Sequence, residues 1–171
     1  MNDRAATTNT TVPQMAFAVH DHRRCVQRAI AAARVACRER GARLTPLREE
    51  VLRLVWQGHR PIGAYALLEK LGVRGGARRV PGPPTVYRAL EFLREQGFVH
   101  RVATLNAYVG CQIGVEPHDH QLYICRGCGS ALESGQPAIS NAIRRHGNEV
   151  GFRVESVALE VLGLCPGCSI P

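Results

Sequence analysis

The sequence lacks any long apolar segment. None of its 171 residues belongs to a run that approaches the roughly 20 consecutive apolar residues needed to span a bilayer, which argues against a membrane-spanning helix. Residues 1–20 are polar and rich in threonine, so they lack the apolar core of a signal peptide, and we expect them to form a disordered arm. The sequence therefore predicts a cytoplasmic protein without a membrane partner, whose thiols stay reduced.

Acidic residues are scarce relative to basic ones. The 22 Lys and Arg residues outnumber the 14 Asp and Glu residues, which gives a formal net charge of +8. This excess suggests an anionic partner such as nucleic acid, although a basic surface alone is weak evidence for one. The length allows one ordinary domain or two small ones. Small domains bury little apolar surface, a shortfall that a bound metal ion can offset.

The sequence also lacks the even number of cysteines that complete disulfide pairing requires. The seven cysteines cannot all pair, and in a reducing compartment they favour metal binding over disulfides. Four thiolates complete the tetrahedral shell of a structural zinc ion, so we predict one such ion held by two Cys-x-x-Cys motifs. These are Cys125-Arg126-Gly127-Cys128 and Cys165-Pro166-Gly167-Cys168, with residues 129–164 between them. The alternative is two independent redox or turn motifs.

The same motifs disfavour an enzyme. A redox Cys-x-x-Cys normally begins a helix, which stabilises the thiolate, whereas both motifs here follow strand-like segments. A catalytic zinc ion keeps one coordination position open, and four protein ligands leave none. We therefore expect neither a thiol oxidoreductase nor a zinc hydrolase, and no small-molecule substrate.

The first half of the chain has the periodicity of helices. Apolar residues recur on one face of residues 22–40, and Thr45-Pro46 is typical of a helix start. Further helices are predicted from 46 to near 58, over 64–71 and over 83–97, with a mobile basic loop at 73–82. Strands at 98–103 and 107–111 then flank a turn at 104–106. Helices followed by a two-stranded hairpin give the outline of a winged helix.

The second half combines strands with one helix. Strands are predicted at 121–125 and 131–133, a helix at 137–146 closed by Gly147, and a long strand at 152–164 that ends at the second Cys pair. The chain is thus predicted to be an α+β protein, with a domain boundary near residues 104–108.

A second strong signal is the segment Pro83-Pro84-Thr85-Val86-Tyr87-Arg88-Ala89-Leu90. A helix N-terminus presents backbone N–H groups and a partial positive charge, which suit a phosphate. Tyr87 and Arg88 fall off the apolar stripe of this helix, and an arginine there can bind guanine or clamp a phosphate. The competing interpretation is an ordinary amphipathic helix with a solvated arginine.

Four motifs resemble, in the same order, those of the ferric uptake regulator family. They are Thr45-Pro46-x-Arg48, the PPTVYRAL segment, Gly97-Phe98-Val99-His100, and Cys125-x-x-Cys128-Gly129 with Cys165-x-x-Cys168. The resemblance covers residues 25–168 and is greatest with the zinc-responsive members of the family. It implies an N-terminal winged helix, a hinge and a C-terminal α/β dimerisation domain, in a homodimeric, zinc-loaded repressor of zinc-uptake genes.

The family pattern also implies domain limits and DNA contacts. The expected parts are a disordered arm at 1–20, a winged-helix DNA-binding domain at 21–104, a hinge at 105–108 and a zinc-binding dimerisation domain at 109–171. The implied partner is double-stranded operator DNA. Its expected contacts are Tyr65 on the third helix, Thr85, Tyr87 and Arg88 on the fourth, and Arg43 as a weaker phosphate ligand.

A repressor needs a sensor as well as a structural ion. Potential ligands lie on both sides of the expected hinge, where a metal ion would fix the DNA-binding domain and so bias a two-state element. The resemblance implies a regulatory zinc ion, and hence two zinc ions per subunit, with the ligands His100, Cys111, His118 and Glu133. The loop between Cys111 and His118 is one residue shorter than in relatives, which leaves His120 as the alternative to His118.

Cys111 indicates which metal is sensed. A thiolate combined with two imidazoles and a carboxylate favours tetrahedral zinc, whereas an iron or manganese sensor would use nitrogen and oxygen ligands. An iron or peroxide sensor of the same family is the alternative function. Cys25 and Cys37 lie on or beside the apolar stripe of the first helix and are predicted to be packing residues.

Overall fold

The computed structural model describes residues 17, 21–75 and 81–169, so the expected arm lies almost wholly outside it, as does half of the basic loop. The helices are α1 (His22–Glu39), α2 (Pro46–Val55), α3 (Ala64–Gly75), α4 (Pro83–Glu95), α5 (Pro137–Glu149) and α6 (Pro166–Ser169). The strands are β1 (Ile62–Gly63), β2 (Val99–Val102), β3 (Ala107–Gly110), β4 (His120–Cys125), β5 (Ala131–Ser134) and β6 (Ala158–Gly163). Within these described ranges, no helix has the length and apolar character to cross a membrane.

The first half packs four helices against a small antiparallel sheet. Asp21 caps α1 by accepting a hydrogen bond from the N–H of Arg23 at 3.0 Å. Thr45 caps α2 in the same way, 3.4 Å from the N–H of Arg48, and Pro46 follows in the first turn. The apolar faces of the helices share one buried core, which includes Ala33, Leu52, Leu67, Val86, Leu90 and Leu93. The sheet has the order β1-β3-β2, and its β2–β3 hairpin, residues 99–110, is the expected wing.

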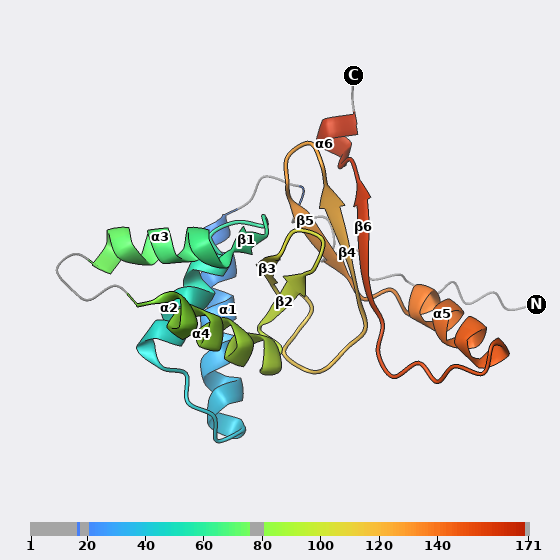
Figure 1. The fold of residues 1–171 in the computed structure, drawn as a ribbon, viewed down its shortest axis with the longest axis horizontal. Coiled ribbons are helices and arrows are strands. Elements are labelled where there is room, and N and C mark those ends of the chain that lie inside the picture. The colour runs from blue at the N-terminus through green and yellow to red at the C-terminus, as the bar shows by residue number, and fades with distance from the viewer. Residues whose placement is uncertain (1–16, 18–20, 76–80, 170–171) are drawn as a thin grey trace, which may run out of the picture.

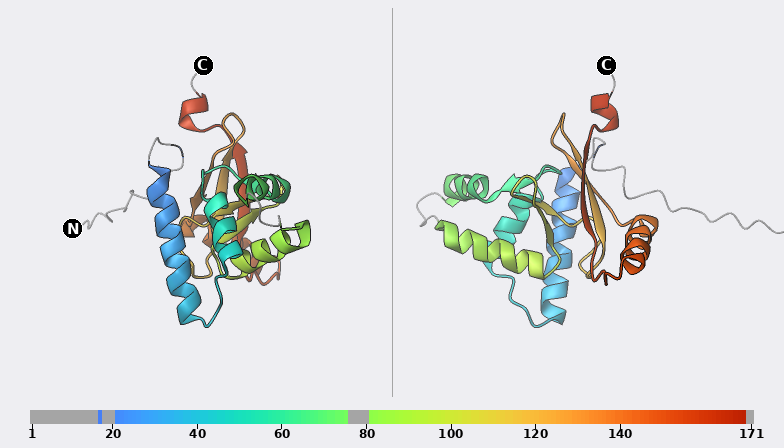
Figure 2. Two further views of the ribbon diagram at one scale, coloured as in Figure 1. Left: turned by 90° about the vertical axis from the view of Figure 1, so that its left-hand side faces the viewer. Right: turned by 45° about the vertical axis from the view of Figure 1, so that its right-hand side comes forward.

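The second half is a three-stranded sheet with the order β5-β4-β6. Strand β4 is antiparallel to β5 and parallel to β6, and the parallel pair requires a crossover, which contains α5. Figures 1 and 2 show the wing between helices α1–α4 and this second sheet, and α5 on the side of the sheet away from those helices. The register places Cys125 beside Gly163, so the ends of β4 and β6 bring the two Cys pairs together.

A small apolar cluster joins the wing to the second sheet. Its members are Val102, Val109, Leu122, Ile124 and Ala131. Beside it, the N–H of Ala131 donates to the carbonyl oxygen of His59 at 2.7 Å. Relative motion of two domains is the expectation unless the interface between them is large and apolar.

Two predicted helix ends were wrong. Helix α3 continues to Gly75 instead of stopping at Gly72. Helix α5 passes through Gly147 and ends at Glu149. Gly147 is a packing position, because a Cβ atom there would lie 2.7 Å from the side chain of Val154. The glycine therefore permits a close approach of the following segment and does not terminate the helix.

The strand predicted over 152–164 was also too long. Strand β6 begins at Ala158, which pairs with His120, the first residue of β4, so the alternating residues before it have no neighbouring strand. The short β1 and α6 had not been predicted. Residues 105–108 lie within the wing, because Val102 pairs with Ala107 across the turn. The chain passes from the first sheet to the second over residues 111–119, here called the linker.

The linker is attached to the C-terminal end of α4. Gly97 follows this helix with a φ of +74°, and a Cβ atom there would lie 2.6 Å from the carbonyl oxygen of Val115. Only glycine accommodates both the left-handed backbone and this contact. The Arg40 guanidinium donates to the carbonyl oxygen of Val115 at 3.0 Å and to that of Gln96 at 2.9 Å. Linker, α1 and α4 therefore meet at one point.

Candidate metal centres and nucleic-acid interface

The four paired cysteines form one compact cluster. Their sulfur atoms all lie within 4.8 Å of one another, in agreement with the sequence prediction that the two pairs share a site. Cys128 Sγ and Cys165 Sγ are 3.8 Å apart, far beyond the roughly 2.05 Å of a disulfide bond. Two thiolates that share one zinc ion, each about 2.3 Å from it, lie about 3.8 Å apart in tetrahedral geometry. The donor set therefore fits zinc.

Backbone hydrogen bonds favour the thiolate form of Cys125. The N–H groups of Cys128 and Cys165 approach Cys125 Sγ at 3.5 and 3.2 Å. These hydrogen bonds lower the pKa of Cys125 to about 6. Hydrogen bonds with Cys165 and Cys125 raise the pKa of Cys168 to about 12, so a proton stays within the cluster. Binding of a divalent metal ion to these thiols would release the protons that they still carry.

The position of Cys165 differs from the expectation that both motifs only follow strands. Cys165 follows β6 but also directly precedes α6, a helix of four residues. A cysteine directly before a helix is also found in redox motifs. The sulfur of Cys165, however, lies 3.8 Å from that of Cys128 in the other pair. The shared cluster thus agrees better with a metal site than with two redox pairs.

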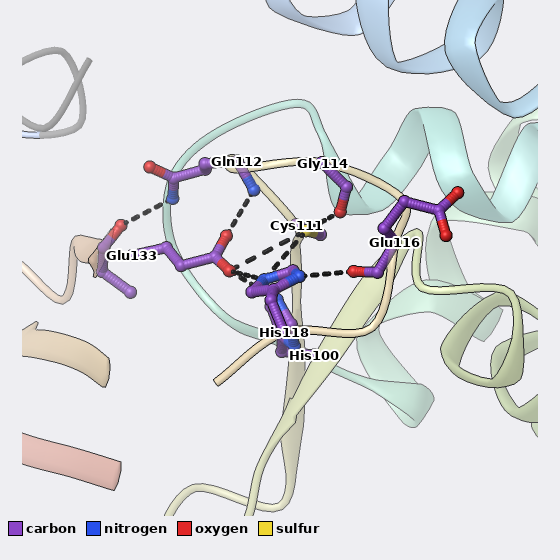
Figure 3. Close-up of polar contacts among 8 residues, drawn as sticks. His100, Cys111, Gln112, Gly114, Glu116, His118 and Glu133 are labelled. Carbon is purple, nitrogen blue, oxygen red and sulfur yellow. Dashed lines mark hydrogen bonds and ion pairs between the residues drawn. The ribbon is translucent and has the colours of Figure 1, made fainter. Parts of the chain in front are cut away.

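A second cluster lies where the wing, the linker and the second sheet meet (Figure 3). Its members are His100 on β2, Cys111 and His118 at the two ends of the linker, and Glu133 on β5, and their donor atoms also lie within 4.8 Å of one another. Glu133 Oε1 is 2.8 Å from His100 Nε2 and 2.7 Å from His118 Nε2. Cys111 Sγ is 3.7 Å from His118 Nε2 and 3.8 Å from Glu133 Oε1.

Glu133 is buried but remains ionised. Burial raises the pKa of its carboxyl, but hydrogen bonds with His100 and His118 and with the N–H of Gln112 outweigh this effect and bring the pKa to about 2. Gln112 also donates through its side chain to the carbonyl oxygen of Ala131 at 3.2 Å. No motif in the sequence identified Gln112 as a partner of Glu133, because its role depends on backbone geometry.

Two further members of this cluster are oriented by backbone carbonyls. His118 Nδ1 lies 2.6 Å from the carbonyl oxygen of Glu116, which directs Nε2 toward Glu133. The Cys111 thiol donates to the carbonyl oxygen of Gly114 at 2.7 Å. Donors bound to one tetrahedral zinc ion through nitrogen and oxygen lie about 3.3 Å apart. The histidines therefore need to move away from Glu133 by only about half an ångström to fit the ion.

His120 does not belong to this donor cluster. Its ring stacks on that of His100, with centroids 3.9 Å apart and planes inclined at 31°. The ring of His118 meets His100 at 88°, edge to face. Of the two histidines that the sequence left open, the geometry favours His118 as the ligand and gives His120 a supporting contact.

The predicted DNA contacts are accessible side chains. Tyr65 at the start of α3 is 71% exposed and Tyr87 on α4 is 41% exposed. Arg43, Thr85 and Arg88 are exposed as well.

The start of α4 differs in one respect from the expectation. Pro83 and Pro84 have no N–H, and the N–H groups of Thr85 and Val86 donate to the carbonyl oxygen of Gly82, at 3.0 and 3.3 Å. This helix start therefore has no spare N–H for a phosphate, so side chains must make the contacts.

The sequence and the fold both resemble those of known proteins. The model of the ferric uptake regulator family matches residues 39–162. The chain belongs to the ferric uptake regulator family. This Fur-family chain is 40% identical over 143 residues to the zinc uptake regulation protein of Escherichia coli (strain K12), an alignment that covers 83% of this chain and 82% of that protein. The family consists of transcription regulators, in agreement with the prediction that the chain is not an enzyme.

Solved structures give the same assignment. A zinc uptake regulator complexed with zinc and DNA is 39% identical, covers 84% of this chain and 95% of that chain, and has a TM-score of 0.76. The holo form of XcZur is 40% identical, with coverages of 82% and 96% and a TM-score of 0.72. Its apo form, 38% identical with coverages of 85% and 98%, has a TM-score of only 0.50. The Fur-family chain is thus closer to the holo than to the apo arrangement.

Proposed function

We propose that this chain is a zinc-responsive, sequence-specific DNA-binding repressor of zinc-uptake genes. One observation carries the proposal: four metal-binding side chains from the wing, the linker and the second sheet converge on one point. His100 belongs to the DNA-binding half and Glu133 to the second sheet. A single ion held by both would fix the relative position of the two halves. The similarity to zinc uptake regulators supports this function.

The proposed zinc content is two ions per subunit, with different tasks. The structural ion is held by Cys125, Cys128, Cys165 and Cys168 and joins the ends of β4 and β6. The regulatory ion is held by His100, Cys111, His118 and Glu133. A bound zinc ion supplies a cationic centre that accepts four donors at once. We place the hinge at the linker, residues 111–119, because residues 105–108 lie inside the wing.

The proposed recognition element is α4. Arg88 and Tyr87 would contact bases or phosphates, Thr85 and Arg43 phosphates, and Tyr65 on α3 the neighbouring backbone. A dimer places two such elements at a fixed separation, which must match half-sites one helical turn apart or a multiple of it. Free rotation at the linker would lose this match, which explains why a metal ion at that position controls DNA binding.

Dimerisation would use the second sheet. Strand β6 is an edge strand, and Val161, Leu162 and Leu164 at its end are 39%, 52% and 53% exposed. Apolar side chains exposed together at a sheet edge are typical of an interface. A second copy of the chain is the proposed occupant.

The decisive experiment combines metal analysis with zinc-titrated DNA binding. Duplexes selected from a random library on the zinc-loaded chain serve as ligands, and binding is measured at about 0.15 M salt with zinc buffered by a chelator. We expect two zinc ions per subunit and a tightening of DNA binding by about 5- to 150-fold on filling of the second site. Equal or better tightening by Fe(II) under anaerobic conditions would instead favour the iron-sensor alternative, which the thiolate of Cys111 disfavours.

A further inference from the structure

In addition to the apolar cluster, two polar contacts join the wing to the second sheet. At its base, His100 Nε2 lies 2.8 Å from Glu133 Oε1 on β5. At its tip, the turn after β2 contacts Glu160 on β6. Strand β4 lies between β5 and β6 (Figure 1), so Glu133 and Glu160 belong to the two edge strands of the second sheet.

Glu160 accepts hydrogen bonds from three donors of the wing turn. The N–H of Thr104 donates to Glu160 Oε2 at 3.0 Å. The N–H of Ala103 and the hydroxyl of Thr104 donate to the same carboxylate. Consecutive backbone N–H groups that point the same way form a concave site for an anion. Hydrogen bonds to an ionised acceptor are roughly twice as strong as those between neutral groups.

Two attachments define an orientation that one attachment does not. Glu133 and Glu160 both pair with Leu122 of β4, one on each side, so their backbones are two strand spacings, or about 9.6 Å, apart. With His100 alone held, the tip of the wing would be fixed only by the apolar cluster, which consists of Val102, Val109, Leu122, Ile124 and Ala131. Relative motion of two domains is the expectation unless their interface is large and apolar, so a second polar contact restricts the motion of the tip.

We propose that Glu160 is a positioning residue, a metal-independent anchor that orients the wing, and with it α4, against the second sheet. The regulatory ligands hold one end of the wing and Glu160 holds the other. This proposal rests on the proposed function, because the orientation of α4 matters only if α4 binds DNA. Zinc-dependent DNA binding then requires both the contact at the regulatory site, which contains zinc, and the contact at Glu160, which does not.

Amide hydrogen exchange tests the anchor without DNA. The exchange of the Ala103 and Thr104 amides is measured on the full chain, in excess zinc and after removal of loosely held zinc with a mild chelator. We expect Glu160→Gln to accelerate both amides by about tenfold in both conditions, the effect of weakening hydrogen bonds to a charged group. Unchanged exchange, or an acceleration only in excess zinc, would overturn the proposal.

DNA binding at saturating zinc tests the consequence. We expect Glu160→Gln and Thr104→Val each to weaken binding by about five- to tenfold. The double variant should lose less binding free energy than the sum of the two single losses, since both changes act on the contact between Glu160 and the wing turn. Thr104→Ser keeps the hydroxyl, and Glu155→Gln changes an exposed carboxylate just before β6, so both should bind like the wild type. Metal analysis should give the same zinc content in every variant.

Wild-type affinity in both single variants, or additive losses in the double variant, would refute the anchor. Failure of the wild-type chain to bind DNA more tightly with zinc would refute the proposed function instead. The exchange measurement still decides the anchor in that case, so the two failures are distinguishable.

Discussion

The Nε2 atom of His118 lies 2.7 Å from Oε1 of Glu133, so the linker and β5 are in direct contact within the proposed regulatory site. Glu133 is 3% exposed and His118 is held from its other side by the carbonyl oxygen of Glu116. The ligands are therefore assembled without a large rearrangement. A metal ion at this point competes mainly with protons for donors that are already in place.

The first prediction concerns the ligand that distinguishes zinc from iron. We expect Cys111→Ser to lower the zinc affinity of the regulatory site by at least about 100-fold, because a serine hydroxyl is a poor ligand for zinc. The structural ion and the dimer should be retained, since Cys111 belongs to the other donor cluster and not to the Cys cluster. Chelator competition and zinc-titrated DNA binding measure the effect. A variant with a normal zinc response would show that the sensor lies elsewhere.

The second prediction is a pH dependence of zinc binding. Burial raises the pKa of Cys111 to about 12, and the charge of Glu133 contributes further. Burial lowers the pKa of His118, but hydrogen bonds to the Glu116 carbonyl and to Glu133 outweigh it, so the net shift is upward. The zinc-free site therefore holds protons that the zinc-bound site has released.

Binding is consequently favoured as pH rises. Between pH 6 and 8 we expect the apparent zinc association constant to increase by at least about tenfold per pH unit, the slope for one released proton. Competition with a chelator of known pH dependence measures it. A flat profile would mean that the thiol of Cys111 is not a ligand.

The third prediction concerns removal of the structural ion. We expect Cys168→Ser to lower the thermal midpoint by more than about 10 °C and to dissociate the dimer, because the ion contributes several kcal/mol to a small domain. A mild chelator should strip the regulatory ion first and leave the dimer intact. Light scattering and calorimetry on the same samples separate the two ions. Loss of both ions at one chelator concentration would contradict their different tasks.

The fourth prediction tests the recognition helix. We expect Arg88→Ala to weaken specific DNA binding by about 1–3 kcal/mol without changing zinc content or thermal stability. Arg88→Lys should restore binding if the contact is to a phosphate, but not if it is a bidentate contact to guanine. Arg145→Ala, an exposed arginine on α5, is the matched control and should have no comparable effect. Unchanged affinity of Arg88→Ala at physiological salt would remove α4 from the interface.

Much of the fold was predictable because the local sequence preferences for helices and turns agree with the tertiary structure. Thr45-Pro46 is a strong local signal for a helix start, and the alternation around the wing turn suits a hairpin. Gly147 misled the prediction because a glycine within a helix is locally indistinguishable from a terminating one. Its role depends on Val154, which approaches from a segment that the sequence pattern assigned to a strand.

The candidate metal ligands were predictable because metal chemistry restricts them to a few residue types. Their supporting residues were not, since backbone groups that any residue carries take part in each contact. Gln112 donates its own N–H to Glu133, Arg40 donates to a backbone carbonyl, and Glu160 accepts from a backbone N–H. The choice between His118 and His120 likewise required coordinates, because the two lie two positions apart and only ring orientation separates them.

Because Gly97 contacts the linker, a movement of the linker would tilt α4 about its C-terminal end. The helix has 13 residues and is therefore about 20 Å long. A tilt of about 10° at the Gly97 end displaces the opposite end, at Pro83, by roughly 3.5 Å, which is close to one base-pair step of B-DNA. A rearrangement of the linker too small to disturb the helical core would thus move the proposed DNA-contacting end of α4 by about one base-pair step.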